Sequence, residues 1–165
     1  MEKELNDELK ELEIVALNEK AENAVAVAVA ATAATGAVPI PFADAPLLIG
    51  EQVTLMATIC GIYGIDVGKD GLKMLAITVI GAGGAAVVGK TIATNLLKMI
   101  PGVGSVGGGV ISAGTAGLVT HAMGKAFIEV CKAVKLGKLG EGDITSSKGV
   151  SMMKNQFRKQ IKKGK

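Results

Sequence analysis

Aromatic side chains are almost absent from this chain, whose 165 residues include three phenylalanines, one tyrosine and no tryptophan. A core built on large rings is therefore excluded, and the aromatic belts that flank resident membrane spans are missing. The apolar surface must come instead from Ala, Val, Ile and Leu, together with 23 glycines. Because small side chains let helix axes approach closely, this composition favours tightly packed helices.

Cysteine is nearly as scarce, since Cys60 and Cys131 are the only two. Neither has a second Cys or a His at ligand spacing, so no metal site is predicted. The first residues are acidic, whereas a secretory leader is basic and then apolar. We therefore expect two reduced, buried thiols in a cytosolic setting.

Charge is concentrated at the two ends of the chain. Residues 1–23 carry eight acidic and three basic side chains, residues 24–131 carry five of each, and residues 132–165 carry ten basic and two acidic. Ten charges in 108 central residues are far fewer than the roughly 25% of an average globular chain. We expect the centre to be buried in protein, lipid or both.

We expect one domain with three parts. They are an acidic amphipathic start of the first helix (1–23), a glycine- and alanine-rich helical core (24–136), and a linker with a basic amphipathic tail (137–165). The first helix should run from residue 2 to about residue 34. Its leading turns carry Leu5, Leu9, Leu12 and Ala16 at spacings of four, three and four, which predicts a packing face with a solvated back.

Proline and glycine punctuate the next part of the chain. Pro39 and Pro41 end the first helix because each lacks a backbone donor and disfavours the helical region for its predecessor. Asp44 is placed as an N-cap for a second helix over about 46–63, which should end at Gly64.

The stretch from Leu72 to Ile100 supports two incompatible interpretations. In the first, Gly84, Gly89, Lys90 and Thr91 complete the phosphate-binding pattern G-x-x-x-x-G-K-[ST]. In the second, apolar residues repeat at intervals of three and four throughout, which predicts a long buried helix. A nucleotide site also needs an acidic residue after a second strand to hold Mg²⁺, and no such run follows the motif. The helix is therefore preferred, and a break near Gly81–Gly84 that gives two helices remains an alternative.

The helical interpretation assigns roles to the small and charged residues of this stretch. Gly81, Ala85 and Gly89 form a row of small residues for close helix packing. A cation within an apolar stripe is costly unless it is paired. We therefore predict a buried ion pair between Lys90 and either Asp44 or Glu51.

A later helix is expected over 112–133, with small residues Ala113 and Gly117 on a packing face and His121 as a packed polar residue on the same row. The basic tail then carries an apolar stripe. Its predicted membrane or partner contacts are Val150, Met153, Lys154, Phe157, Arg158, Ile161 and Lys162. This pattern is typical of a helix that lies on an anionic surface or docks on an acidic partner. The alternative is a tail docked onto its own domain.

Three phrases carry a family resemblance: PIPFADAPLLIGEQ (39–52), GKTIATNLLKMIPGVG (89–104) and TAGLVTHAMGKAF (115–127). Over roughly residues 28–131 the chain resembles the bacterial family labelled domain of unknown function 697. Members often follow an Era-like or interferon-inducible-type GTPase domain and are commonly described as membrane-associated. The resemblance implies an α-helical accessory domain in which the Gly-Lys-Thr segment is helical, and it implies no catalytic residues. Because this chain lacks the GTPase domain, any coupling to a GTPase would act in trans.

Together these observations predict an all-α fold, a bundle of helical hairpins with a glycine-rich centre, an acidic amphipathic N-terminal helix and a basic C-terminal helix. We expect no enzyme, but a membrane-associating, self-assembling domain that forms homo-oligomers, on the cytoplasmic side of a membrane or in the cytoplasm. The alternative is a soluble adaptor or regulatory protein that binds a GTPase or another helical protein. No cofactor or nucleic-acid partner is expected.

Overall fold

The computed structural model describes residues 1–36, 44–81 and 108–163, and within these ranges every regular element is helical. The helices are α1 (Glu2–Gly36), α2 (Asp44–Tyr63), α3 (Lys69–Gly81), α5 (Gly108–Lys135) and α6 (Ser147–Lys163), with a short 3-10 turn η1 (Glu141–Asp143) before α6. The predicted all-α class is confirmed for this part of the chain. The expected helix beyond Gly81, up to Ile100, lies outside the described residues.

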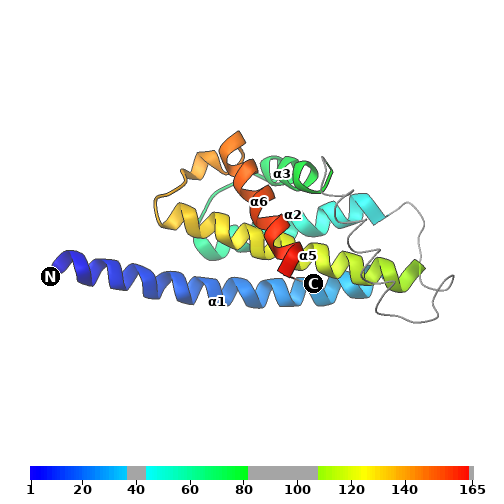
Figure 1. Cartoon of the computed structure of the whole chain (residues 1–165), viewed down its shortest axis with the longest axis horizontal. Helices are drawn as coiled ribbons and strands as arrows, with labels where there is room; N and C mark the ends of the chain where they lie inside the picture. The colour runs from blue at the N-terminus through cyan, green and yellow to red at the C-terminus, as the bar shows by residue number, and fades with distance from the viewer. Residues whose placement is uncertain (37–43, 82–107, 164–165) are drawn as a thin grey trace.

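The helices form three layers (Figure 1). α1 lies along one side, α5 and α2 form the middle, and α3 and α6 lie on the side away from α1. α5 is the central helix because it packs against α1, α2 and α6. The core between these layers is built mainly from Ala, Val, Ile, Leu and Met, with Tyr63, Phe127 and Phe157 as its largest buried side chains.

α1 is a single helix of 35 residues, close to the expected range of 2 to about 34. Ala21 and Val25 are buried, and Leu17 and Ala28 are partly buried against the core. These positions recur every three or four residues and form one stripe. The stripe starts only at about the fifth turn, so the first turns of α1 extend past the rest of the molecule (Figure 1).

Glycines end α2 and α5 in the same manner. Gly64 has a φ of 65°, and Gly137 has a φ of 71°. Glycine adopts this left-handed region without steric cost, and the turn lets amides beyond the helix bond to its last carbonyls. The amide of Ile65 donates to the carbonyl of Cys60 at 2.9 Å, and the amide of Lys138 donates to that of Ala133 at 2.8 Å. The predicted end of the second helix at Gly64 is confirmed.

α5 differs from the expectation in two respects. It begins at Gly108, four residues before the predicted start, although its first residues are glycines. His121 is exposed, so its assignment as a packed residue is wrong. The buried face of α5 instead contains Thr120 and Gly124, because α1 and α2 contact α5 along a line offset from His121.

Candidate functional site

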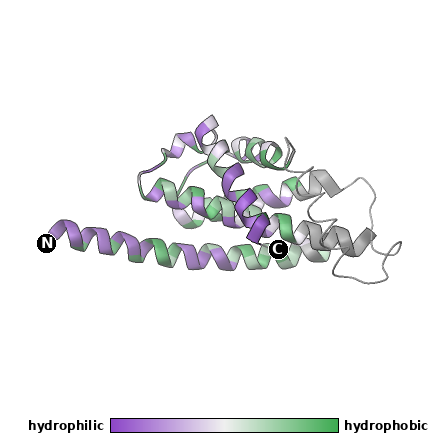
Figure 2. Ribbon diagram, in the orientation of Figure 1, coloured by the Kyte–Doolittle hydropathy of each residue, from purple (hydrophilic) through white to green (hydrophobic). Residues whose placement is uncertain are grey.

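Of the helices that the structure describes, α6 has the largest net charge. It carries six basic residues and no acidic residue, and its last turn contains Lys162 and Lys163. Gly149, Met153, Phe157 and Ile161 recur every four residues and are all buried. The helix is therefore sharply amphipathic, with its apolar residues buried in the core and its basic residues exposed or half-buried. Figure 2 shows the ribbon of α6 as largely hydrophilic.

The predicted contact residues of the tail divide between these two sides. Met153, Phe157 and Ile161 are buried in the core, and Val150 and Lys154 are half-buried. Arg158 and Lys162 are exposed. The apolar stripe therefore docks on the domain itself. This arrangement corresponds to the alternative given above, a tail docked onto its own domain. The outward residues that can meet a surface are Lys148, Lys154, Arg158, Lys159, Lys162 and Lys163, which we call the basic face.

A close backbone contact sets the position of α6. A Cβ at Gly149 would overlap the carbonyl oxygens of Ile144 and Asp143, so only glycine fits there. The Ser146 hydroxyl donates to the Asp143 carbonyl at 2.7 Å, and the Val150 amide donates to the Ser146 carbonyl at 2.9 Å. Leu139 and Ile144 are buried on the same side. The segment before α6, expected to be a linker, therefore includes core residues.

The lysines of α5 contrast with those of the basic face. Lys125 pairs with Glu22 of α1, Lys132 pairs with Glu129 at 3.1 Å, and Lys135 approaches Glu13 of α1 at 4.0 Å. Among the described residues, no ion pair involves any member of the basic face. The positive charge of α5 is thus partly balanced within the molecule, whereas that of α6 is available to an external anion.

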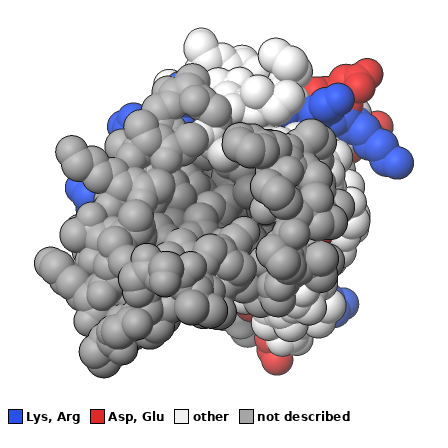
Figure 3. All heavy atoms as spheres, turned by 90° about the vertical axis from the view of Figure 1, so that its right-hand side faces the viewer, with Lys and Arg blue, Asp and Glu red and all other residues white. Residues whose placement is uncertain are grey.

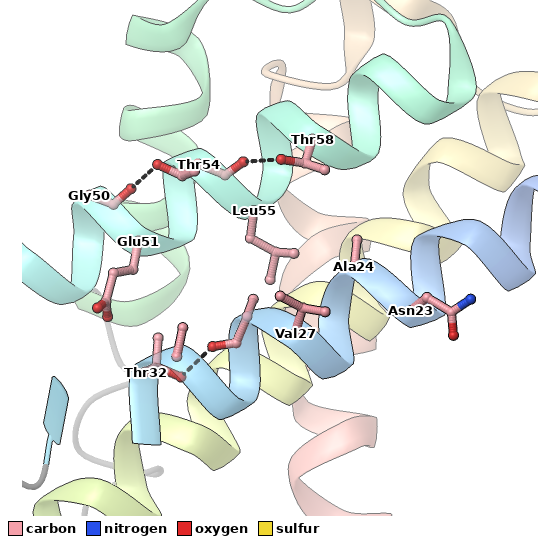
Figure 4. Close-up of a pocket in the computed structure, with 11 residues that line it drawn as sticks. Asn23, Ala24, Val27, Thr32, Gly50, Glu51, Thr54, Leu55 and Thr58 are labelled. Atoms are coloured by element: carbon pink, nitrogen blue, oxygen red, sulfur yellow. Dashed lines mark hydrogen bonds between the residues drawn. The ribbon is translucent and has the colours of Figure 1, made fainter. Parts of the chain in front are cut away.

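A groove of about 790 Å³ runs between α1 and α2 (Figure 4). Ala24, Val27 and Ala28 line one wall, and Gly50 and Leu55 line the other. Thr54 and Thr58 also line it, but each donates its hydroxyl to the carbonyl four residues earlier, at 3.0 and 2.9 Å. The groove is therefore mainly apolar, and its threonine hydroxyls are already bonded to the backbone.

α1, α2 and α5 meet at Gly124. A Cβ on this glycine would lie 2.5 Å from Val25 Cγ2 and 3.2 Å from Leu55 Cδ2. Sequence reasoning missed Gly124, although it lies seven residues after Gly117 and so on the same helix face. Of the predicted small packing residues, Gly117 is buried in α5, Ala113 lies in α5, and Gly81 ends α3. Ala85 and Gly89 lie outside the described residues, so this packing row stays a prediction.

Asp44 begins α2, and Glu51 is half-buried about two turns further on, where it lines the groove. Lys90 lies outside the described residues, as does the whole Gly84–Thr91 motif. The ion pair between Lys90 and Asp44 or Glu51 therefore stays a prediction.

Cys60 and Cys131 are both buried and free, as expected. They lie on α2 and α5, and a hydrogen bond between the two thiols lowers the pKa of Cys60 and raises that of Cys131. The hydroxyl of Tyr63 is buried without a hydrogen-bond partner in the described structure. Its pKa is raised chiefly by burial, and further by Cys131, Glu129 and Glu22. These groups belong to the core and are closed to a substrate.

Seen along the long axis, from the end where α5 begins, the charged side chains that are visible lie at the edges of the view (Figure 3). No helix in the described ranges is long and apolar enough to cross a membrane. The same ranges contain no group of three or more His, Cys, Asp or Glu side chains that could hold a metal ion.

Fold and surface together define a helical-bundle protein with a cationic outer helix. The chain belongs to the family described as Domain of unknown function (DUF697), whose model matches residues 1–156. It is also similar to Magnetosome membrane protein 22 of Magnetospirillum gryphiswaldense, with 30% identity over 149 residues that cover 88% of this chain and 70% of that protein. No solved structure matches the chain.

Proposed function

We propose that this chain is a non-catalytic helical domain that binds the surface of an anionic membrane and self-assembles there. The observation that carries the proposal is the basic face of α6, whose six cationic side chains form no ion pair with any residue that the structure describes. Burial of Met153, Phe157 and Ile161 holds that face in one orientation on the core. The similarity to a protein named as a magnetosome membrane protein supports the same function.

Electrostatic attraction is the proposed binding force. Each basic side chain near an anionic bilayer contributes about 1 kcal/mol, within a Debye length of the surface. The cytoplasmic leaflet carries most of the anionic lipid, so the cytoplasmic side of a membrane is the proposed location. Because the apolar stripe of α6 lies in the core, the mode that we propose is peripheral and reversible, through headgroups.

Vesicle flotation tests this proposal directly. The full chain should float with vesicles that contain phosphatidylserine at low salt, ignore purely zwitterionic vesicles, and dissociate as salt rises. A triple variant, Arg158→Glu/Lys159→Glu/Lys162→Glu, should lose more than about 100-fold in partitioning, because at least three favourable contacts of about 1 kcal/mol each are removed.

The matched control reverses three lysines elsewhere, Lys3→Glu/Lys10→Glu/Lys20→Glu on α1, with the same change in net charge. These side chains are exposed and far from α6 in the chain, so the control should still float. Loss of flotation in both variants would show that net charge alone matters and would contradict a role for the basic face.

A second candidate is a soluble adaptor that docks on a GTPase or another protein. The docking of the α6 stripe on its own domain favours this candidate, because it buries the surface that would otherwise enter lipid. Coupling to a GTPase in trans rests on the family resemblance alone. A monodisperse chain that ignores anionic vesicles even at low salt would replace the membrane proposal with this one.

A further inference from the structure

The first turns of α1 form an arm that has no packing partner in the described structure. Residues 1–13 are exposed throughout and extend past the bundle (Figure 1). Leu5, Leu9 and Leu12 are 58%, 54% and 66% exposed. Removing apolar surface from water is favourable, so an exposed leucine row at this position calls for a partner.

The exposed row and the docked stripe lie on different sides of the same helix. Leu5, Leu9, Leu12 and Ala16 follow spacings of four, three and four, and form one row. At 100° per residue, the centre of this row lies about 150° from the centre of the docked stripe around Ala21 and Val25. Neither α5 nor α2 can cover the exposed row while α1 stays docked. Ala16, Glu19 and Asn23 are exposed further along the same side, so that side of α1 remains open.

We infer that the arm of a second copy covers this row, in an antiparallel pair of α1 helices about a twofold axis. The spacing places the leucines at the a and d positions of a heptad, with Leu5 and Leu12 at d and Leu9 at a. Antiparallel pairing matches Leu9 with Leu12 of the second copy, and Leu5 with Ala16 of the second copy. Because the docked stripes point away from this seam, the two bundles lie on opposite sides of the helix pair and do not collide.

Charge at the flanking positions selects this orientation. A parallel pair would place Glu8 of each copy beside Glu13 of the other, which is repulsive on both sides of the seam. The antiparallel pair places Glu8 beside Val15 and Glu13 beside Asn6, so neither carboxylate meets another. In the antiparallel pair, the leucine row ends at a contact between Glu2 of one copy and Glu19 of the other, and these two carboxylates repel. Salt screens this terminal repulsion, so the pair should tighten as salt rises.

This inference deepens the self-assembly part of the proposed function and rests on it, but it does not involve the basic face of α6. Self-assembly and membrane binding also respond oppositely to salt. The dimer should tighten as salt rises, whereas binding to anionic headgroups should weaken. Each part can therefore fail without the other.

Sedimentation equilibrium of the full chain without lipid tests the inference. We expect a reversible dimer in the micromolar range that tightens between low and physiological salt. Leu9→Ser/Leu12→Ser should weaken it at least tenfold, because four exposed leucines leave the seam. The matched control, Val27→Ser, removes an exposed apolar side chain of α1 outside the overlap and should leave the dimer unchanged.

A second variant tests the orientation and keeps the arm intact. Asn6→Lys places a cation beside Glu13 of the second copy in the antiparallel pair, and should tighten the dimer about three- to fivefold. In a parallel pair it would face Met1 and have no such effect. A chain that stays monomeric, or a dimer that ignores both the leucine and the Asn6 changes, overturns the inference. A monomer that still floats with anionic vesicles overturns it and leaves the membrane proposal standing.

Discussion

Gly124 of α5 lies directly against Val25 of α1, so closely that an added Cβ would lie 2.5 Å from one Val25 methyl and 3.0 Å from the other. Both methyl groups are affected, so a change of the Val25 rotamer would leave at least one methyl group against the added Cβ. Gly124 also faces Leu55 of α2, so α1, α2 and α5 all meet at this residue.

Gly124→Ala should destabilise the fold by about 1–3 kcal/mol, because α1 must move away from α5 to accept the methyl group. Urea denaturation followed by circular dichroism measures the change. Gly61→Ala is the matched control, since Gly61 lies in α2 and a Cβ there meets nothing within 4 Å. It should be neutral or stabilising by up to about 1 kcal/mol, as alanine favours helix. Equal effects at both sites would contradict the close approach at Gly124.

The buried pair Gln52 and Thr120 joins α2 to α5. Gln52 Nε2 donates to Thr120 Oγ1 at 2.8 Å, and Gln52 Oε1 has no partner in the described structure. Thr120→Val should cost about 1–3 kcal/mol because it leaves the buried amide without any hydrogen bond.

The double variant Gln52→Leu/Thr120→Val removes both polar groups and should recover most of that loss. Thermal unfolding of the wild type, both single variants and the double variant completes the cycle. Additive losses in the double variant would mean that the two side chains do not act as a pair.

Tyr63 provides a pH-dependent test of core packing. It is the only tyrosine, and tryptophan is absent, so tyrosinate absorbance reports this residue alone. Burial raises its pKa above the usual value near 10. The folded state therefore disfavours the phenolate, and the associated stability is complete below pH 10 and is lost as pH rises through the raised pKa.

In a spectrophotometric titration, tyrosinate should appear only above the range of a free tyrosine and should coincide with unfolding. The same titration in denaturant should return the ordinary midpoint. A native chain that forms tyrosinate near pH 10 without loss of helical circular dichroism would show that the hydroxyl reaches solvent.

Nucleotide binding provides a test of the motif at Gly84–Thr91. The sequence lacks a second acidic strand end to hold Mg²⁺, so we expect neither ATP nor GTP to bind. Isothermal titration with each nucleotide and Mg²⁺ should give no saturable heat, and Lys90→Ala should leave the trace unchanged. Saturable binding that Lys90→Ala abolishes would establish a phosphate site in place of a helix.

Local patterns were sufficient to predict the helices and several of their ends. Leucine spacing predicted α1, Gly64 predicted the end of α2, and the stripe from Met153 to Ile161 predicted α6, because each depends on neighbours within one or two turns. The same reasoning failed at the start of α5 and at His121. Glycines at that start have weak intrinsic helix propensity, and the orientation of His121 depends on which neighbouring helices α5 meets.

The surfaces available for binding were decided by the tertiary structure. The sequence predicted a packing face for the leucine row of α1, and it left the apolar stripe of α6 able to meet a membrane, a partner or the domain itself. Packing buries Met153, Phe157 and Ile161 and leaves Leu5, Leu9 and Leu12 in solvent, because α6 lies across α5 while α1 extends past its end. A sequence specifies that a helix has an apolar side, but only the positions of the other helices determine whether that side is already covered.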